Sequence, residues 1–223
     1  MTSTSSVDML LGRRARDHAD VKTLQVLVNT AQTEAAQQNS AAAYENLAQL
    51  DLWLCEVGRD SNNEQLVKTA AQDGVDAANK AVELNDKSSE AHRLEGELLG
   101  EMIPHVFAGG MRYGLLSSKR LDRAIELEPR NANAYIARGV NYFYTPAAFG
   151  GGHDKAIAML QKAIEVDSTA DSAHLWLAQI YLEEGNIESS FQEISEARRI
   201  NSERSITNHL YEQIAAKKTS SGK

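Results

Sequence analysis

The stretch from Asp171 to Arg204, DSAHLWLAQIYLEEGNIESSFQEISEARRINSER, decides the fold of this chain. Its small and large side chains fall at the offsets where two antiparallel helices must interlock; they are Ala173, His174, Leu177, Ala178, Tyr181, Ser190, Ile194 and Ala197. Between the two halves, Gly185 and Asn186 both tolerate positive φ and can form the tight turn. The pattern therefore predicts a hairpin of two antiparallel α-helices.

The same pattern recurs upstream, which indicates an internal repeat. The end of the second helix recurs as KAIEVD from Lys162, RAIELE from Arg123 and KAVELN from Lys80. The start of the first helix recurs at Ala91 and Ala134. Both sets of anchor alanines are separated by the same intervals of 43 and 39 residues. Two independent anchors with equal spacing establish a helical repeat array.

The repeat resembles the tetratricopeptide repeat (TPR) from Ala41 to Ser202, with Ser202 in place of the usual closing proline. The resemblance implies an all-α fold, a right-handed α-solenoid of antiparallel helical hairpins. We expect a flexible N-terminal segment, a single helical domain over residues 18–216 and a disordered tail over 217–223. Within the domain, the expected parts are a degenerate repeat (40–86), three repeats (89–129, 132–168 and 171–204) and a capping helix (205–216).

Two repeats exceed the usual length, so each must carry an insertion between its helices. The insertions lie near Met102–Met111 and Tyr144–His153, and both combine proline, phenylalanine and a glycine run. The segment Pro146-x-x-Phe149-Gly150-Gly151, with GMRYG at residues 110–114, resembles a group of exported bacterial TPR-like proteins. It is also similar to the helical accessory component of TRAP-type transporters. That likeness implies a periplasmic role in handling a ligand.

Composition excludes several classes of function. The formal charge of −8 argues against nucleic-acid binding, because binding phosphates needs a concentrated basic surface. The one cysteine, Cys55, permits no internal disulfide. No segment has about 18 consecutive apolar residues, so we expect no membrane insertion and a soluble chain. We expect a periplasmic location if a leader has been removed and a cytoplasmic one otherwise.

No motif predicts catalysis. None of the six histidines forms an HExxH motif or another pair at metal-ligand spacing. No serine, threonine or cysteine has a recognisable base partner. We therefore expect a non-enzymatic protein without a cofactor or a metal.

TPR domains commonly hold a peptide in the concave groove lined by the first helix of each repeat. Carried onto this chain, the groove positions are Arg93, Ile136, Val140, Phe143, Leu175 and Gln179. Only Arg93 could pair with a terminal carboxylate, and Glu97 one turn away opposes that pairing. The groove is therefore not the carboxylate clamp of chaperone-binding TPR domains, and its apolar lining suits an amphipathic or hydrophobic segment.

The sequence thus predicts a binding or scaffold module that presents an apolar groove to a protein or peptide partner, or to another copy of itself. The alternative is a small-ligand-binding accessory protein of a transporter. In that case a hydrophobic ligand would lie in a pocket walled by the insertions, at Phe107, Tyr113, Tyr144 and Phe149.

Overall fold

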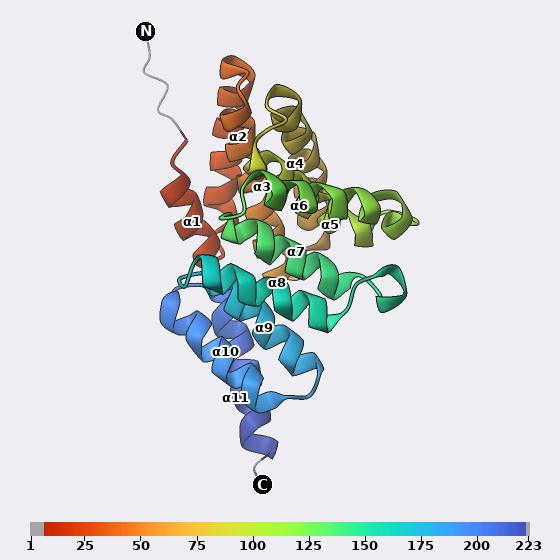
Figure 1. Cartoon of the computed structure of the whole chain (residues 1–223). Coiled ribbons are helices and arrows are strands. Elements are labelled where there is room, and N and C mark those ends of the chain that lie inside the picture. The colour runs from red at the N-terminus through yellow and green to blue at the C-terminus, as the bar shows by residue number, and fades with distance from the viewer. Residues whose placement is uncertain (1–6, 222–223) are drawn as a thin grey trace. The chain divides into compact units, whose positions relative to one another are not determined.

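A computed structural model describes residues 7–221 of the chain (Figure 1). These residues form α-helices joined by short turns, and no strand occurs among them. The helices are α1 (Met9–Asp17), α2 (Val21–Gln38), α3 (Ala41–Asp60), α4 (Glu64–Leu84), α5 (Ser89–Met102), α6 (Leu115–Leu127), α7 (Ala132–Tyr144), α8 (His153–Val166), α9 (Asp171–Glu183), α10 (Ile187–Ile200) and α11 (Ser205–Ser221). The predicted all-α fold of antiparallel helical hairpins is confirmed.

The chain divides into two compact units, each with its own internal contacts. Unit 1 is Met1–Leu127 and contains α1 to α6, and unit 2 is Glu128–Lys223 and contains α7 to α11. This division differs from the single domain expected over residues 18–216. Each unit is described by itself below.

In unit 1, helices that follow one another in the chain pack side by side. The hairpin α3–α4 occupies the predicted degenerate repeat, with α2 packed ahead of it on α3, and α5–α6 is the following repeat. Side chains at the N-caps explain where several helices begin. The Ser40 hydroxyl accepts from the Ala43 amide at the start of α3, and the Ser88 hydroxyl accepts from the Ala91 amide at the start of α5.

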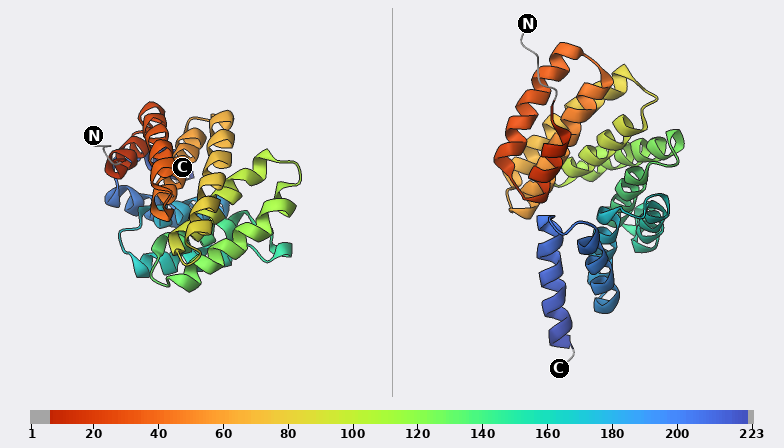
Figure 2. Two further views of the ribbon diagram at one scale, coloured as in Figure 1. Left: turned by 90° about the horizontal axis from the view of Figure 1, so that it is seen from above. Right: turned by 90° about the vertical axis from the view of Figure 1, so that its left-hand side faces the viewer.

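Helix α1 corrects the expectation of a flexible segment over residues 1–17. It packs along α2 and α3 (Figure 2). Gly12 lets its backbone approach so closely that an added Cβ would lie 2.8 Å from Cζ3 of Trp53. The Arg16 guanidinium lies 5.8 Å from the Trp53 ring centroid. This segment is therefore fixed by an aromatic contact that local sequence does not reveal; residues 1–6 lie outside the described part.

In unit 2, the hairpins α7–α8 and α9–α10 form the two remaining repeats, and α11 packs on α10 (Figure 2). Ile214 of α11 is buried in one core with Leu175, Ala178, Ile194 and Ala197. Helix α11 occupies the region predicted for the capping helix but continues to Ser221.

The C-terminal end of α11 corrects the expected disordered tail over residues 217–223. The Lys218 ammonium lies 2.8 Å from the Glu188 carboxylate and 4.3 Å from the Phe191 ring centroid. These contacts hold the helix through most of that segment, while residues 222 and 223 lie outside the described part.

Both insertions fall between the two helices of a hairpin. In unit 1, a 3-10 turn (Ile103–His105) and a π-helical turn (Gly110–Gly114) connect α5 to α6. In unit 2, a 3-10 turn (Ala147–Phe149) lies between α7 and α8. Extra residues placed there leave the packing of the paired helices intact, which is why the repeat tolerates them.

A small residue brings the two helices of a hairpin together at the middle of the pair. In unit 1, the Ser117 hydroxyl of α6 donates to the Gly96 carbonyl of α5 at 2.7 Å. In unit 2, the Ser190 hydroxyl of α10 donates to the Ala178 carbonyl of α9 at the same distance. An added Cβ on Gly96 would lie 2.7 Å from Cγ of Leu121. Close packing of the hairpin thus depends on small side chains at equivalent positions in the two units.

We expect Gly96→Val to destabilise unit 1 by about 2 kcal/mol, because the added side chain overpacks the α5–α6 contact. The matched control is Gly100→Val on the same helix, where the nearest atom to an added Cβ is Ser117 Oγ at 3.9 Å. Urea unfolding followed by Trp53 fluorescence in a Trp176→Phe background measures unit 1 alone. Equal effects of the two substitutions would contradict the packing argument.

No described helix combines the length and the apolar character that a membrane span requires.

Candidate partner-binding surface

Arg93, the predicted groove residue of unit 1, is engaged within its own unit. Its guanidinium donates to the carboxylates of Glu90 at 2.5 Å and Glu97 at 2.8 Å, and to the Gln49 side-chain oxygen at 2.6 Å. The side chain is buried. Burial raises the pKa of Glu97 to about 7, against the opposing effect of Arg93. The structure therefore places Arg93 in an ion-pair network that joins α5 to α3.

The predicted groove residues of α7 in unit 2 differ in exposure. Ile136 is buried, whereas Val140 and Phe143 are half-buried toward the C-terminal end of the helix. The three residues lie on one face of α7, because their spacing of four and three residues matches the helical period. Only the C-terminal part of this face has side chains that a partner can reach.

Phe143 belongs to a group of rings that we call the aromatic cluster: Phe143 and Tyr144 of α7, Trp176 of α9 and His153 of α8. The Phe143 centroid lies 4.8 Å from that of Tyr144, 5.4 Å from that of His153 and 6.0 Å from that of Trp176. Tyr144 and Trp176 meet edge to face at 5.9 Å. Tyr144 is 68% exposed. The cluster thus joins three helices of unit 2 and presents aromatic surface to solvent.

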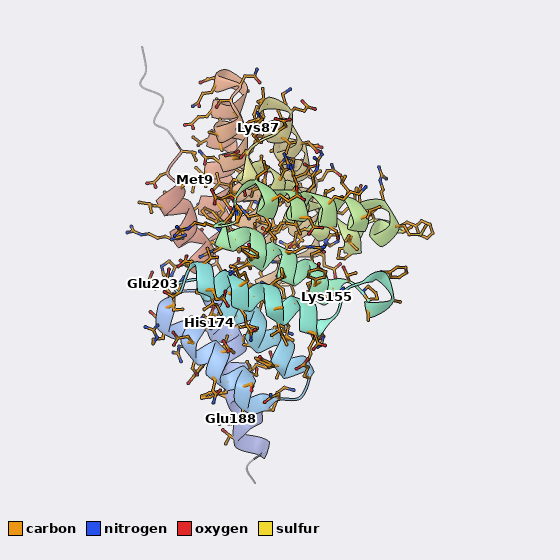
Figure 3. The ribbon with its side chains drawn as sticks, viewed as in Figure 1. Met9, Lys87, Lys155, His174, Glu188 and Glu203 are labelled. Carbon is orange, nitrogen blue, oxygen red and sulfur yellow. The ribbon has the colours of Figure 1, made fainter. Side chains whose placement is uncertain are left out.

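Polar groups contact His153 of the cluster and the nearby Tyr142 ring of α7. His153 Nδ1 lies 3.0 Å from the Glu184 carboxylate. Lys155, labelled in Figure 3, places its ammonium 5.6 Å from the Tyr142 ring centroid, and the Arg138 guanidinium lies 3.9 Å from the same centroid. Of these charged side chains Lys155 is exposed, whereas Arg138 is buried.

The two predicted groove residues of α9 have intramolecular partners. Leu175 is buried in the core that Ile214 of α11 shares. Gln179 is half-buried, and its side-chain nitrogen lies 3.3 Å from the Glu183 carboxylate. The capping helix therefore leaves little of the Leu175 side chain for another molecule.

Sequence reasoning missed Trp176, which connects α9 to the aromatic cluster. The available signal was its position three residues before Gln179, since residues at that spacing share a helix face. Trp176 stands between Leu175 and Leu177, and this local sequence does not show whether its ring lies in the core or at the surface.

The insertion aromatics proposed to wall a ligand pocket come from both units and differ in exposure. Phe107 is 101% exposed and Phe149 is also exposed, while Tyr113 is half-buried against the core of unit 1. Phe107 and Tyr113 lie in unit 1, whereas Tyr144 and Phe149 lie in unit 2. A fully exposed side chain cannot wall an enclosed cavity within its own unit.

The histidines at the first-helix positions of two repeats serve internal contacts. His92 Nε2 lies 2.9 Å from the Asp86 carbonyl. His174 is labelled in Figure 3, and its Nδ1 atom lies 2.7 Å from the Glu193 carboxylate. Within residues 7–221, no group of three or more His, Cys, Asp or Glu side chains is placed to hold a metal ion.

Known proteins resemble this chain in part of the sequence and through most of the fold. No family profile matches it. Mitochondrial import receptor subunits TOM70 of Rattus norvegicus and Homo sapiens are 29% and 28% identical to it over 90 residues. That match covers 40% of this chain but only 14% of the receptors.

A solved structure covers much more of the chain. The crystal structure of a thermophilic TPR protein of Thermus thermophilus has a TM-score of 0.68 over 87% of this chain and 91% of its own, at 18% identity. This chain has the tetratricopeptide-repeat fold. The HusA haemophore from Porphyromonas gingivalis is also similar to it, with a TM-score of 0.59 and 21% identity over 91% of this chain and 96% of that protein. In this TPR chain Phe143 and Tyr144 lie at the C-terminal end of α7 and Trp176 lies within α9, so three rings of the aromatic cluster come from the first helices of two repeats.

Proposed function

We propose that this TPR chain is a non-enzymatic binding module that holds an apolar segment of a partner protein on unit 2. The observation that supports this most directly is the aromatic cluster, in which Phe143 and Tyr144 at the C-terminal end of α7 and Trp176 of α9 are half-buried or exposed. Val140, one turn before Tyr144, extends the apolar surface along α7.

The chemistry of the cluster suits protein binding. Aromatic side chains bury a large area on contact, and tyrosine and tryptophan are enriched at the positions that contribute most to binding free energy. The rings contact one another before a partner arrives, so little side-chain entropy is lost when it binds. Lys155, which is exposed and lies over the Tyr142 ring, adds a positive charge outside the cluster.

The alternative of a small-ligand carrier has less support from the structure. It needs Phe107 and Phe149 in the wall of a pocket, and both side chains are exposed. The fold shared with a haemophore does not by itself supply such a pocket, because a TPR fold can carry different functions.

The test is selection of peptides from a random displayed library against the full chain. We expect the selected peptides to be rich in aliphatic and aromatic residues. Val140→Asp should weaken their binding at least tenfold, since it places a charge in a desolvated contact, and Trp176→Ala should weaken it by a similar factor. Fluorescence polarisation with labelled peptides measures these dissociation constants.

Phe149→Ala is the matched control, because it removes an exposed ring in the neighbouring insertion. Binding that survives Val140→Asp and Trp176→Ala, or that is lost with Phe149→Ala alone, would contradict the proposal. Sedimentation of the chain without peptide measures its oligomeric state. A dimer that Val140→Asp disrupts would mean that another copy of this chain occupies the surface.

A further inference from the structure

Unit 1 contains a pocket that the proposed function does not use. It has a volume of about 280 Å³ and lies between α2 and α4, over α3. The buried residues of its lining come from α3 and α4, and the exposed residues of its lining form a polar rim. The lining residues are Gln25, Val28, Asn29, Asp51, Leu54, Leu66, Thr69, Ala70 and Asp73.

Asp51 is the unusual member of this lining. It is 2% exposed, and its Oδ2 atom has no hydrogen-bond partner in the described part of the chain. On α3 it stands among apolar side chains, with Leu50 before it and Leu54 one turn later. An unpaired carboxylate at such a position is unfavourable, because burying a charge without a partner costs several kcal/mol. Helix packing alone therefore does not explain this residue.

A close approach of α4 to α3 forms the acidic part of the pocket. At Gly74, an added Cβ would lie 3.0 Å from the Asp51 Cβ and 2.7 Å from Cδ2 of Leu98. The absence of a side chain there brings the α4 backbone against Asp51, and Asp73, the preceding residue, lies at the rim. Burial raises the pKa of Asp51 to about 8, and the nearby Asp73 acts in the same direction.

The charged surroundings of Asp51 are one-sided. Among the pocket-lining residues, α2 contributes only the neutral Gln25 and Asn29, and α4 contributes Asp73 as its one ionisable group. On α3 the buried Cys55 thiol, whose pKa is raised chiefly by burial, also interacts electrostatically with Asp51, and Glu101 and Arg59 act on the same thiol. No cationic side chain is among the residues that line the pocket, so an ionised Asp51 has no counter-ion in this lining.

We propose that this pocket binds an alkylammonium group, with Asp51 as its buried counter-ion, Asp73 at the rim and the alkyl stem against Val28, Leu54 and Leu66. The volume corresponds to about nine water molecules, which suits a small group rather than a large ligand. The amide and hydroxyl groups of Gln25, Asn29 and Thr69 can accept the remaining ammonium hydrogens.

A bare metal ion is a weaker match to the same residues. Only two carboxylates line the pocket, and no described group of three or more His, Cys, Asp or Glu side chains is placed to hold a metal. Ca²⁺ requires about six to eight oxygen ligands, and the apolar wall offers none. The site is separate from the aromatic cluster of unit 2, so the proposal does not depend on the proposed function.

The ammonium group could come from a free small amine or from a lysine side chain of a partner, and the two sources share the chemistry that Asp51 would recognise. The test is an NMR titration of the ¹⁵N-labelled full chain at pH 8.5. Its probes are n-butylammonium chloride, the neutral isostere n-butanol, and a blocked peptide with one central lysine or with norleucine in its place.

We expect butylammonium to shift amide signals of α2, α3 and α4, and to bind at least tenfold more tightly than butanol. Asp51→Asn should weaken its binding at least tenfold, and the rim variant Asp73→Asn should weaken it by a smaller factor. Asp86→Asn, an equal change of charge at an exposed residue outside the pocket, should leave it unchanged. Affinity should fall by up to tenfold for each pH unit below 8, because Asp51 must release a proton before it can pair.

Tighter binding of the lysine peptide than of butylammonium would identify a partner's side chain as the source, and the reverse order would identify a free amine. Four results would overturn the proposal: no shift with butylammonium, equal binding of butanol, full binding by Asp51→Asn, or displacement of butylammonium by an equal concentration of Ca²⁺. Because Asp73 is exposed, Asp73→Asn gives a second test that does not depend on tolerance of a change in the core.

Discussion

Asp51→Asn should stabilise unit 1, by about 3 kcal/mol at pH 8, although it alters a buried side chain of a core helix. The asparagine has nearly the same shape and carries no charge, so it removes the need to keep a proton on the carboxyl or to bury an anion. Unfolding by urea, followed by Trp53 fluorescence in a Trp176→Phe background, measures the change in unit 1.

The pH dependence follows from the raised pKa of Asp51. The unfolded chain releases this proton near the ordinary value of 3.8, whereas the folded chain keeps it up to about pH 8. Wild-type stability therefore declines as the pH rises from 4 to 8, and the advantage of Asp51→Asn grows over that range and then levels off. An advantage that is constant between pH 4 and 8 would contradict the assignment, and Asp86→Asn is the control without a buried charge.

Arg93→Met should have an effect of similar size in the opposite direction, a loss of about 3 kcal/mol from unit 1. The substitution keeps much of the aliphatic stem but removes the guanidinium that pairs with Glu90 and Glu97 and bonds Gln49. Glu97 would then be a buried carboxylate without its cation. The same Trp53 unfolding experiment at pH 8, above the pKa of about 7 that Glu97 has beside Arg93, measures the loss.

The matched control is Arg123→Met, which breaks the 3.2 Å pair with Glu126 on the exposed face of α6. Both side chains of that pair are largely solvated, and such pairs contribute about 0.5 kcal/mol. Equal losses for the two substitutions would show that the Arg93 network is no stronger than a surface ion pair. An unchanged stability of Arg93→Met would leave Arg93 free to be the groove residue that the sequence predicts.

The hairpins and the sites of the two insertions could be predicted because they depend on local patterns. Equal spacing of the alanine anchors reports the period of the repeat directly. The glycine runs mark places where the chain departs from that period. Helix caps such as Ser40 are likewise local, since the hydroxyl bonds an amide three residues later.

What could not be predicted depends on contacts between residues far apart in the sequence. The partner of Arg93 on α3, Gln49, is 44 residues away. Asp51 is an ordinary helical aspartate until Gly74 brings α4 against it. Trp53 fixes α1 in the same way, through the space at Gly12. In each case a side chain changes its role because of an element that no local pattern connects to it.

The end of α5 and the insertion that follows it carry two methionines in opposite surroundings within a short stretch of chain. Met111 is 90% exposed, whereas Met102 is 3% exposed at the end of α5. Mild peroxide should therefore convert Met111 to its sulfoxide well before Met102. Mass spectrometry of the peptide that contains both would then report, without any label, whether another molecule covers this insertion or whether the helix beneath it has opened.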